Sequence, residues 1–169
     1  MACSDSSPRK ALKSASKRAA FGPVVLVSVP YAAMPQIGAD YAAELAGKII
    51  IDTGNPREAR DGAMARDALA KGSGIATAEF LKNRRVVRAF NCIGAESLAA
   101  DGNRKPERYA IPIGGDDAEA LAVAQRLVND AGFDAVVMGS LAKSREFDMG
   151  APLAKGTWTA AELRAQLAR

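Results

Sequence analysis

The stretch VVLVSVPYAA, residues Val24–Ala33, opens with a run of β-branched residues and ends in a proline, a tyrosine and small residues. A run that is apolar on both faces is typical of a strand buried between two layers of helices. In open parallel sheets, ligands bind beyond the carboxyl ends of the strands. The residues that follow this strand are therefore candidates for a binding site.

A helix is expected next, because apolar residues recur at intervals of about four up to Gly47. These residues are Ala33, Ile37, Tyr41 and Leu45. The segment KIIIDTGNP at 48–56 predicts a second buried strand, and two such strands around one helix make a parallel βαβ unit.

Further alternation continues to the end of the chain. Strands are predicted at 85–93, 108–115 and 134–141, and helices are expected around 76–81, after Gly94, over 118–132 and from Thr157 onward. Asp116 and Asp117 are expected to cap the third of these helices, and a Thr–Ala–Ala–Glu capping box begins the last. The pattern predicts an α/β fold with a Rossmann-like open, mainly parallel sheet flanked by helices.

Composition excludes several classes of function. No apolar run approaches the roughly 20 residues of a membrane span, and the net charge of +4 comes largely from basic residues before the first strand. Aromatic residues make up only 5%, without the basic and aromatic interleaving that stacks bases. We therefore expect neither membrane insertion nor nucleic-acid binding.

The chain contains no histidine, so neither the commonest general base nor the commonest metal ligand is available. Cys3 and Cys92 lie far apart and form no CxxC pair, which argues against a disulfide scaffold or a zinc site. We expect a cytoplasmic protein with no metal site, although a transit-peptide role for the basic first residues stays open.

No complete glycine-rich phosphate loop is found. The fragment at 72–77 follows a charged helical stretch, and the acids at 116–117 would repel a phosphate. The turns after the first three strands are more informative: Val29-Pro30-Tyr31, Thr53-Gly54-Asn55-Pro56 and Ala89-Phe90-Asn91-Cys92. Together they would place carbonyls, amide side chains and an aromatic surface at one edge of the sheet.

The ordered series of segments VVLVSVPYAA, AGKIIIDTGNP, RVVRAFNCIGAESLA, IPIGGDDAEALAVAQRLVNDAGFDAVVMGSL and SREFD resembles the NADP oxidoreductase, coenzyme F420-dependent family. The likeness runs from about Phe21 to Phe147.

The resemblance implies that the three turns contact the ribose and nicotinamide of NADP. It transfers the cofactor-binding role to Val29, Pro30, Asn55, Pro56, Ala89, Phe90 and Asn91. It also implies hydride transfer between NADP(H) and a second cofactor or small acceptor, with F420 or a flavin as a candidate electron partner, and a homodimer. The cofactors would carry the chemistry, so no catalytic side chain is assigned.

The departure from the family concerns the beginning of the chain. Family members start with a strand, a glycine-rich loop, a helix and a second strand, whereas residues 1–22 form a basic lead-in that we expect to be partly helical or disordered. Residues 23–169 would then be an N-terminally truncated dinucleotide-binding domain. Two alternatives stay open: a non-catalytic relative that dimerises or binds nucleotide weakly, and a reading-frame error at the start.

Overall fold

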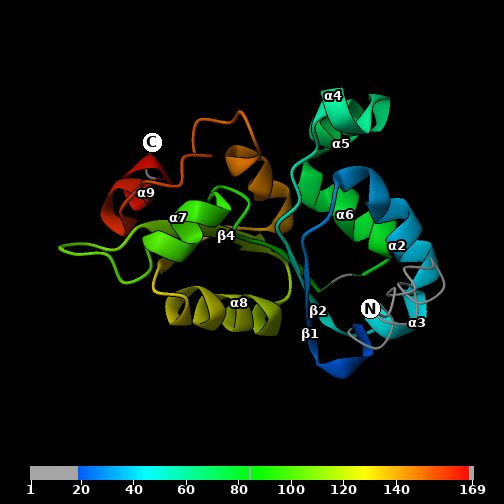
Figure 1. Cartoon of the computed structure of the whole chain (residues 1–169), viewed down its shortest axis with the longest axis horizontal. Coiled ribbons are helices and arrows are strands. Elements are labelled where there is room, and N and C mark those ends of the chain that lie inside the picture. The colour runs from blue at the N-terminus through cyan, green and yellow to red at the C-terminus, as the bar shows by residue number, and fades with distance from the viewer. Residues whose placement is uncertain (1–18, 84, 168–169) are drawn as a thin grey trace, which may run out of the picture.

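The computed structural model describes residues 19–83 and 85–167 (Figure 1). These residues form one five-stranded sheet in the order β1-β2-β3-β4-β5. The strands are β1 (Val24–Val27), β2 (Ile49–Asp52), β3 (Val86–Arg88), β4 (Ala110–Gly115) and β5 (Asp134–Gly139).

The first three strands are parallel to one another, and β4 is parallel to β5. The two groups meet in a short antiparallel pairing of β3 with β4, in which Val87 lies opposite Gly115 and Arg88 opposite Gly114. The prediction of an open, mainly parallel α/β sheet is therefore confirmed. Each predicted strand is present but shorter: β4 begins two residues later than predicted, and the other four strands end earlier, where their last predicted residues turn away from the sheet.

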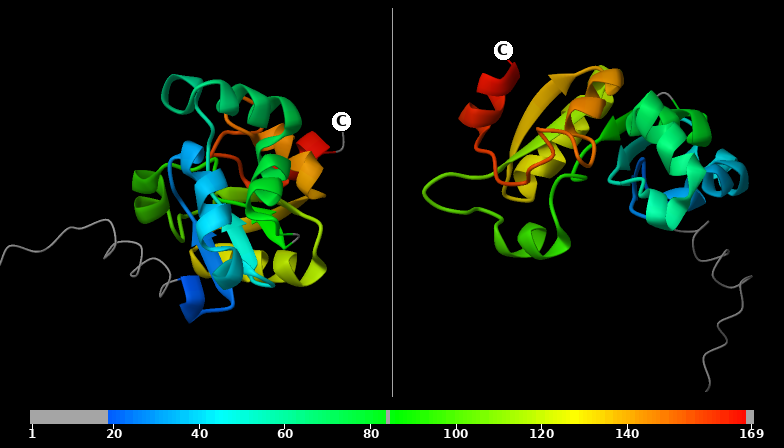
Figure 2. Two further views of the ribbon diagram at one scale, coloured as in Figure 1. Left: turned by 90° about the vertical axis from the view of Figure 1, so that its right-hand side faces the viewer. Right: turned by 90° about the horizontal axis from the view of Figure 1, so that it is seen from above.

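Helices connect the strands. Their bounds are η1 (Tyr31–Ala33), α2 (Met34–Asp40), α3 (Ala42–Leu45), α4 (Glu58–Asp61), α5 (Ala63–Lys71), α6 (Ser73–Leu81), α7 (Ala95–Ala100), α8 (Ala118–Asp130), η2 (Leu141–Phe147) and α9 (Ala160–Leu167). In Figure 1, α2 and α6 lie at one end of the molecule and α9 at the other. The loop after α7 extends away from the sheet (Figure 2).

Alternate strand residues supply two separate cores, one on each face of the sheet. On the first face, Ile50 and Val86 pack with Tyr31, Met34 and residues of α5 and α6. On the second face, Ile51 and Val87 are among the strand residues that pack against α8. A third cluster joins β4 and β5 to η2 and α9. Both faces are therefore covered, which accounts for the continuous apolar runs in the strands.

The structure corrects three local predictions. The helix expected over 31–46 is interrupted at Tyr41, whose φ of −119° and ψ of 23° are not helical. Helix α6 begins at Ser73, earlier than expected, because Gly72 takes a positive φ and stands just outside it. Asp117 caps α8 through the Ala120 amide at 2.8 Å, whereas Asp116 accepts from the Leu141 amide instead.

The capping box of the last helix is confirmed. The Thr159 amide donates to Glu162 Oε2 at 2.8 Å, and the Glu162 amide donates to Thr159 Oγ1 at 3.3 Å. The reciprocal bonds satisfy two backbone N–H groups at the start of α9, and they explain why the helix begins at Ala160.

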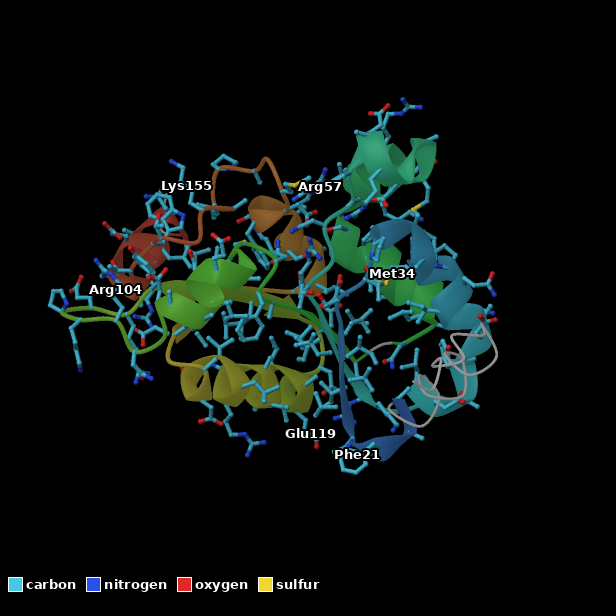
Figure 3. All side chains as sticks on the ribbon, in the orientation of Figure 1. Phe21, Met34, Arg57, Arg104, Glu119 and Lys155 are labelled. Atoms are coloured by element: carbon cyan, nitrogen blue, oxygen red, sulfur yellow. The ribbon has the colours of Figure 1, made fainter. Side chains whose placement is uncertain are left out.

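The basic lead-in lies mostly outside the described residues. Its last residues are held by Lys48, whose Nζ donates to the carbonyls of Ala19 and Gly22 at 2.6 and 2.7 Å. Phe21 projects from the surface and is 95% exposed (Figure 3). Within the described part of the chain, β1 is an edge strand, and no helix is both long enough and apolar enough to cross a membrane.

Candidate functional site

A pocket of about 520 Å³ opens where β1, β2 and β3 end. Its lining comes from β1, from the residues that follow the three strands, from α7 and from the end of α8. The residues are Leu26, Ser28, Thr53, Asn55, Phe90, Asn91, Ile93, Ala95, Leu98 and Ala131. The pocket therefore lies at the carboxyl edge of the parallel strands, where ligands bind in open α/β sheets.

The structure brings three of the seven predicted site residues together in this lining: Asn55, Phe90 and Asn91. The remaining four do not line it. Val29 packs against the first core, and Pro30 is an exposed residue ahead of η1.

Pro56 and Ala89 are buried beneath the turns that carry the pocket residues. Thr53, Ser28 and Leu26 take part in the lining, although none of them was among the predicted site residues.

The turn after β3 has an uncommon backbone. Phe90 adopts a φ of 61°, in the left-handed region that non-glycine residues seldom occupy. The chain thereby reverses at the end of the strand, with the Phe90 ring half-buried at the pocket and Ala89 fully buried in the second core. Such conformations persist only where the surrounding contacts enforce them.

The side-chain amide of Asn55 is held on both sides. Its Oδ1 accepts from Arg88 Nη2 at 3.2 Å, and its Nδ2 donates to the Asn91 carbonyl at 2.8 Å. A guanidinium can only donate and a carbonyl can only accept, so both bonds specify the same orientation of the amide. This pairing also links the turn after β2 to the turn after β3.

The side-chain amide of Asn91 is hydrogen-bonded at one end only. Its Nδ2 donates to the Phe147 carbonyl at 2.8 Å, while its Oδ1 is buried without a hydrogen-bond partner. The whole residue is only 8% exposed. A buried acceptor without a partner costs free energy, about 1–3 kcal/mol, unless a ligand or water supplies the donor.

Behind the pocket lies a buried cluster of charged residues. Arg88, on β3, is fully buried and donates from Nη1 to Asp52 Oδ2 at 3.0 Å and from Nε to Asp148 Oδ1 at 2.8 Å. The same Nη1 donates to the Gly54 carbonyl at 2.7 Å. Asp148 also accepts from the amide and the hydroxyl of Ser73, at the start of α6. The cluster joins β2, β3, α6 and the segment after η2.

Burial and the neighbouring charges shift the pKa values of Asp52 and Arg88 in this cluster. It raises the pKa of Asp52 above the ordinary value, although Arg88 opposes the shift. For Arg88, burial opposes the charged form, but coulombic attraction to Asp52 and Asp148 outweighs it and raises the pKa. Arg88 therefore stays cationic, and the acids around it supply the compensating charge.

Tyr31 lies beside this cluster and is hydrogen-bonded to α6. Its hydroxyl donates to the Ser73 carbonyl at 2.7 Å and lies 3.1 Å from Thr77 Oγ1. Burial raises the pKa of the phenol far above its ordinary value. Tyr31 therefore remains protonated and acts here as a hydrogen-bonding core residue.

The predicted site did not include Arg88, Asp52 or Asp148, although each lies in a segment that carried the family resemblance. The sequence did contain one indication of this charged cluster. A charge within a buried strand, such as the arginine of VVRAF, needs a partner of opposite charge. The sequence did not show which acid would supply it.

The described part of the chain contains no group of three or more His, Cys, Asp or Glu residues placed to hold a metal ion. Cys92 donates to the Phe147 carbonyl, and burial raises the pKa of its thiol to about 12. A thiol so rarely ionised is a poor nucleophile. The lining also holds no lysine or arginine, so the pocket offers no fixed cation to a phosphate.

No protein-family model matches the chain. Among solved structures, a hypothetical protein from Sinorhizobium meliloti, SMa0349, superposes with a TM-score of 0.70 and 27% identity, over 88% of this chain and 70% of that one. A candidate F420-dependent NADP reductase from Arthrobacter sp. FB24 superposes with a TM-score of 0.68 and 23% identity, over 79% and 62% of the two chains. The similarity to this candidate F420-dependent NADP reductase is one of fold.

Two curated proteins are also similar in sequence. The metalloreductase STEAP3 of Rattus norvegicus is 36% identical over 110 residues, which is 63% of this chain and 20% of STEAP3. The protein YjhV of Escherichia coli (strain K12) is 45% identical over 51 residues, 28% of this chain and 37% of YjhV. The chain thus spans less than half of either curated relative. Two of these four proteins are named as reductases.

Proposed function

We propose that this chain belongs to an NADP-dependent oxidoreductase and that the pocket holds the nicotinamide end of the cofactor. The observation that carries the proposal is the pair of amides at the pocket. Asn91 has a buried acceptor without a partner, and Asn55 has a second Nδ2 hydrogen beyond the one given to Asn91. A primary carboxamide, which has one acceptor and two donors, complements this pair.

The remaining lining suits a flat ring. Phe90, Ile93 and Leu98 supply an apolar surface, and a volume of about 520 Å³ falls within the range of small-molecule sites. Apolar walls would exclude water from the reacting face. The residues present therefore fit a nicotinamide group.

The bound cofactor would supply a hydride, and the protein would hold it in position. None of the lining residues is an acid, a lysine or an arginine, so the chain's own contribution is to bind, orient and exclude water. This suits a transfer in which a second cofactor, F420 or a flavin, accepts the hydride. The homodimer and the cytoplasmic location remain parts of the proposal.

The same lining favours one alternative. Because it holds no cationic side chain, the phosphates would gain little from it, and binding through these residues alone would be weak. A non-catalytic module that binds nucleotide weakly is the second candidate function.

Titration with NADPH, followed by nucleotide fluorescence, tests the proposal. We expect saturable binding that is at least about tenfold weaker in Asn91→Leu, since the ligand would lose its partner at Oδ1. Gln36→Leu, which removes an amide from an exposed residue of α2 outside the pocket lining, serves as the control and should bind as the wild type does.

No saturation up to millimolar NADPH would overturn the proposal. Binding without hydride transfer to F420 or to flavin mononucleotide would favour the non-catalytic alternative.

A further inference from the structure

We infer that Arg88, which does not line the pocket, is the positioning residue that sets the hydrogen-bonding pattern of Asn55 and Asn91. The inference rests on the proposed function and goes beyond it. It concerns what keeps the amide pair in the orientation that recognises a carboxamide.

The first step concerns the Asn55 amide, whose two ends have similar shape but opposite polarity. Rotating it by 180° would place its NH2 against the Arg88 guanidinium and its oxygen against the Asn91 carbonyl. Both hydrogen bonds would be lost, and like polarities would face each other. Arg88 therefore leaves only one orientation available to the Asn55 side chain.

The second step concerns Arg88 itself, which cannot turn to follow Asn55. Besides Asn55, its guanidinium donates to Asp52, to the Gly54 carbonyl and to Asp148, at distances between 2.7 and 3.0 Å. The donors of a guanidinium lie in one rigid plane, so these contacts fix the direction of Nη2. The side chain is fully buried, which excludes water as a competing acceptor.

The third step concerns the backbone. Because Arg88 holds the carbonyl of Gly54, the residue before Asn55, it restrains the turn as well as the side chain. Asn55 in turn reaches the Asn91 carbonyl, and the Asn91 side chain is held by Phe147, the neighbour of Asp148. Arg88 thus donates to Gly54 and Asn55 at one end of this series of hydrogen bonds, and to Asp148, next to Phe147, at the other end.

Arg88→Lys separates positioning from charge. The ammonium group keeps a buried cation beside Asp52 and Asp148, but its three donors share one nitrogen and cannot also reach Asn55 as the planar guanidinium does. We expect this variant to unfold cooperatively, and we expect the Asn55 side-chain NH2 signals in its NMR spectrum to move toward those of a free amide.

Binding then provides the second measurement. In Arg88→Lys, NADPH should bind about fivefold or more weakly, the loss expected when one oriented hydrogen-bonding group becomes free to rotate. The affinity for 2′,5′-ADP, which lacks the nicotinamide, should be unchanged. An unchanged NADPH affinity would overturn the inference, and so would an equal loss for both ligands.

A second variant provides the same test if Arg88→Lys does not fold. Arg88→Met combined with Asp52→Asn and Asp148→Asn removes the three charges together and leaves no buried ion unpaired. The same two measurements apply to it, with the same expected and contrary results.

The two proposals can fail separately. If wild-type protein binds no NADPH, the proposed function falls, while the Asn55 signals still test whether Arg88 orients that amide. If wild type binds NADPH and the Asn55 signals do not change in Arg88→Lys, the inference about Arg88 falls and the proposed function stands.

Discussion

Nε of Arg88 lies 2.8 Å from Oδ1 of Asp148, a residue 60 positions further along the chain, and both side chains are buried. The pair joins β3, in the first group of parallel strands, to the segment that follows β5 and η2. It lies directly behind the turns that form the pocket. The stability of the fold and the geometry of the pocket therefore depend on the same contact.

Removing one partner of this buried ion pair should lower the free energy of unfolding. In Asp148→Ala, Arg88 and the Ser73 amide lose their acceptor inside the protein, and we expect the free energy of unfolding to fall by about 3–5 kcal/mol. Glu146→Ala is the matched control, because its ion pair with Lys143 is at the surface and should contribute less than about 1 kcal/mol. Chemical denaturation measures both, and equal losses would contradict the prediction.

Gly38 lies where α2 crosses α6, and a Cβ atom there would come within 1.8 Å of the Phe80 carbonyl oxygen. The obstacle is backbone, so a rotamer change cannot relieve it. We expect Gly38→Ala to destabilise the protein by about 3 kcal/mol or more, or to prevent folding. Gly94→Ala, with open space at its Cβ position and a φ of −73°, should have little effect on the melting temperature. Retention of wild-type stability in Gly38→Ala would show that the two helices are further apart.

Asp61 should contribute acid-sensitive stability. Its carboxylate accepts from Arg60 and from the amides of Arg57 and Ala32, and the Arg60 side chain is the main cause that holds its pKa below the ordinary value of 3.8. The folded state thus binds this proton less readily than the unfolded state does. The contribution is complete above the ordinary pKa and is lost as the pH falls below it.

The variant Asp61→Asn tests this sign. It should lower the free energy of unfolding by about 1–3 kcal/mol at neutral pH and by progressively less as the pH falls below 3.8. Denaturation at several pH values measures the difference between the two proteins. A difference that stayed constant from pH 7 to pH 3 would show that Asp61 is not the group that titrates.

Cys92 should resist alkylation in the folded protein. With a thiol pKa of about 12, almost none of it is thiolate at pH 8, and the Phe147 carbonyl holds its proton. Peptide mass spectrometry after treatment with iodoacetamide should show Cys92 unmodified until a denaturant is added. Complete modification under native conditions would contradict the burial seen here.

The sequence predicted much of the fold because its signals are local. Buried runs such as IIID predict strands, and capping residues such as Thr159 and Asp117 predict where helices begin. The interruption at Tyr41 was missed, since the apolar spacing continues across it while the backbone does not. The spacing of apolar residues indicates which of them face the core. It does not establish that the backbone is helical at every residue along the segment.

The candidate site was predicted only in part. Asn55, Phe90 and Asn91 follow strands that the sequence shows to be parallel, and parallel strands bring their carboxyl ends to one edge. Whether each side chain would line the pocket or pack beneath it depends on turn geometry, such as the positive φ of Phe90, which no local pattern specified.

The sequence by itself determined the alternation of strands and helices, the edge of the sheet at which the three turns gather, and the absence of histidine from the whole chain. Only the tertiary structure decided that Arg88 would pair with Asp52 and Asp148, and that Asn55 and Asn91 would present a donor and a free acceptor. The physical reason is distance along the chain. Hydrophobic periodicity acts over a few neighbouring residues, whereas a buried charge is satisfied by whichever partner the packed fold brings within hydrogen-bonding distance.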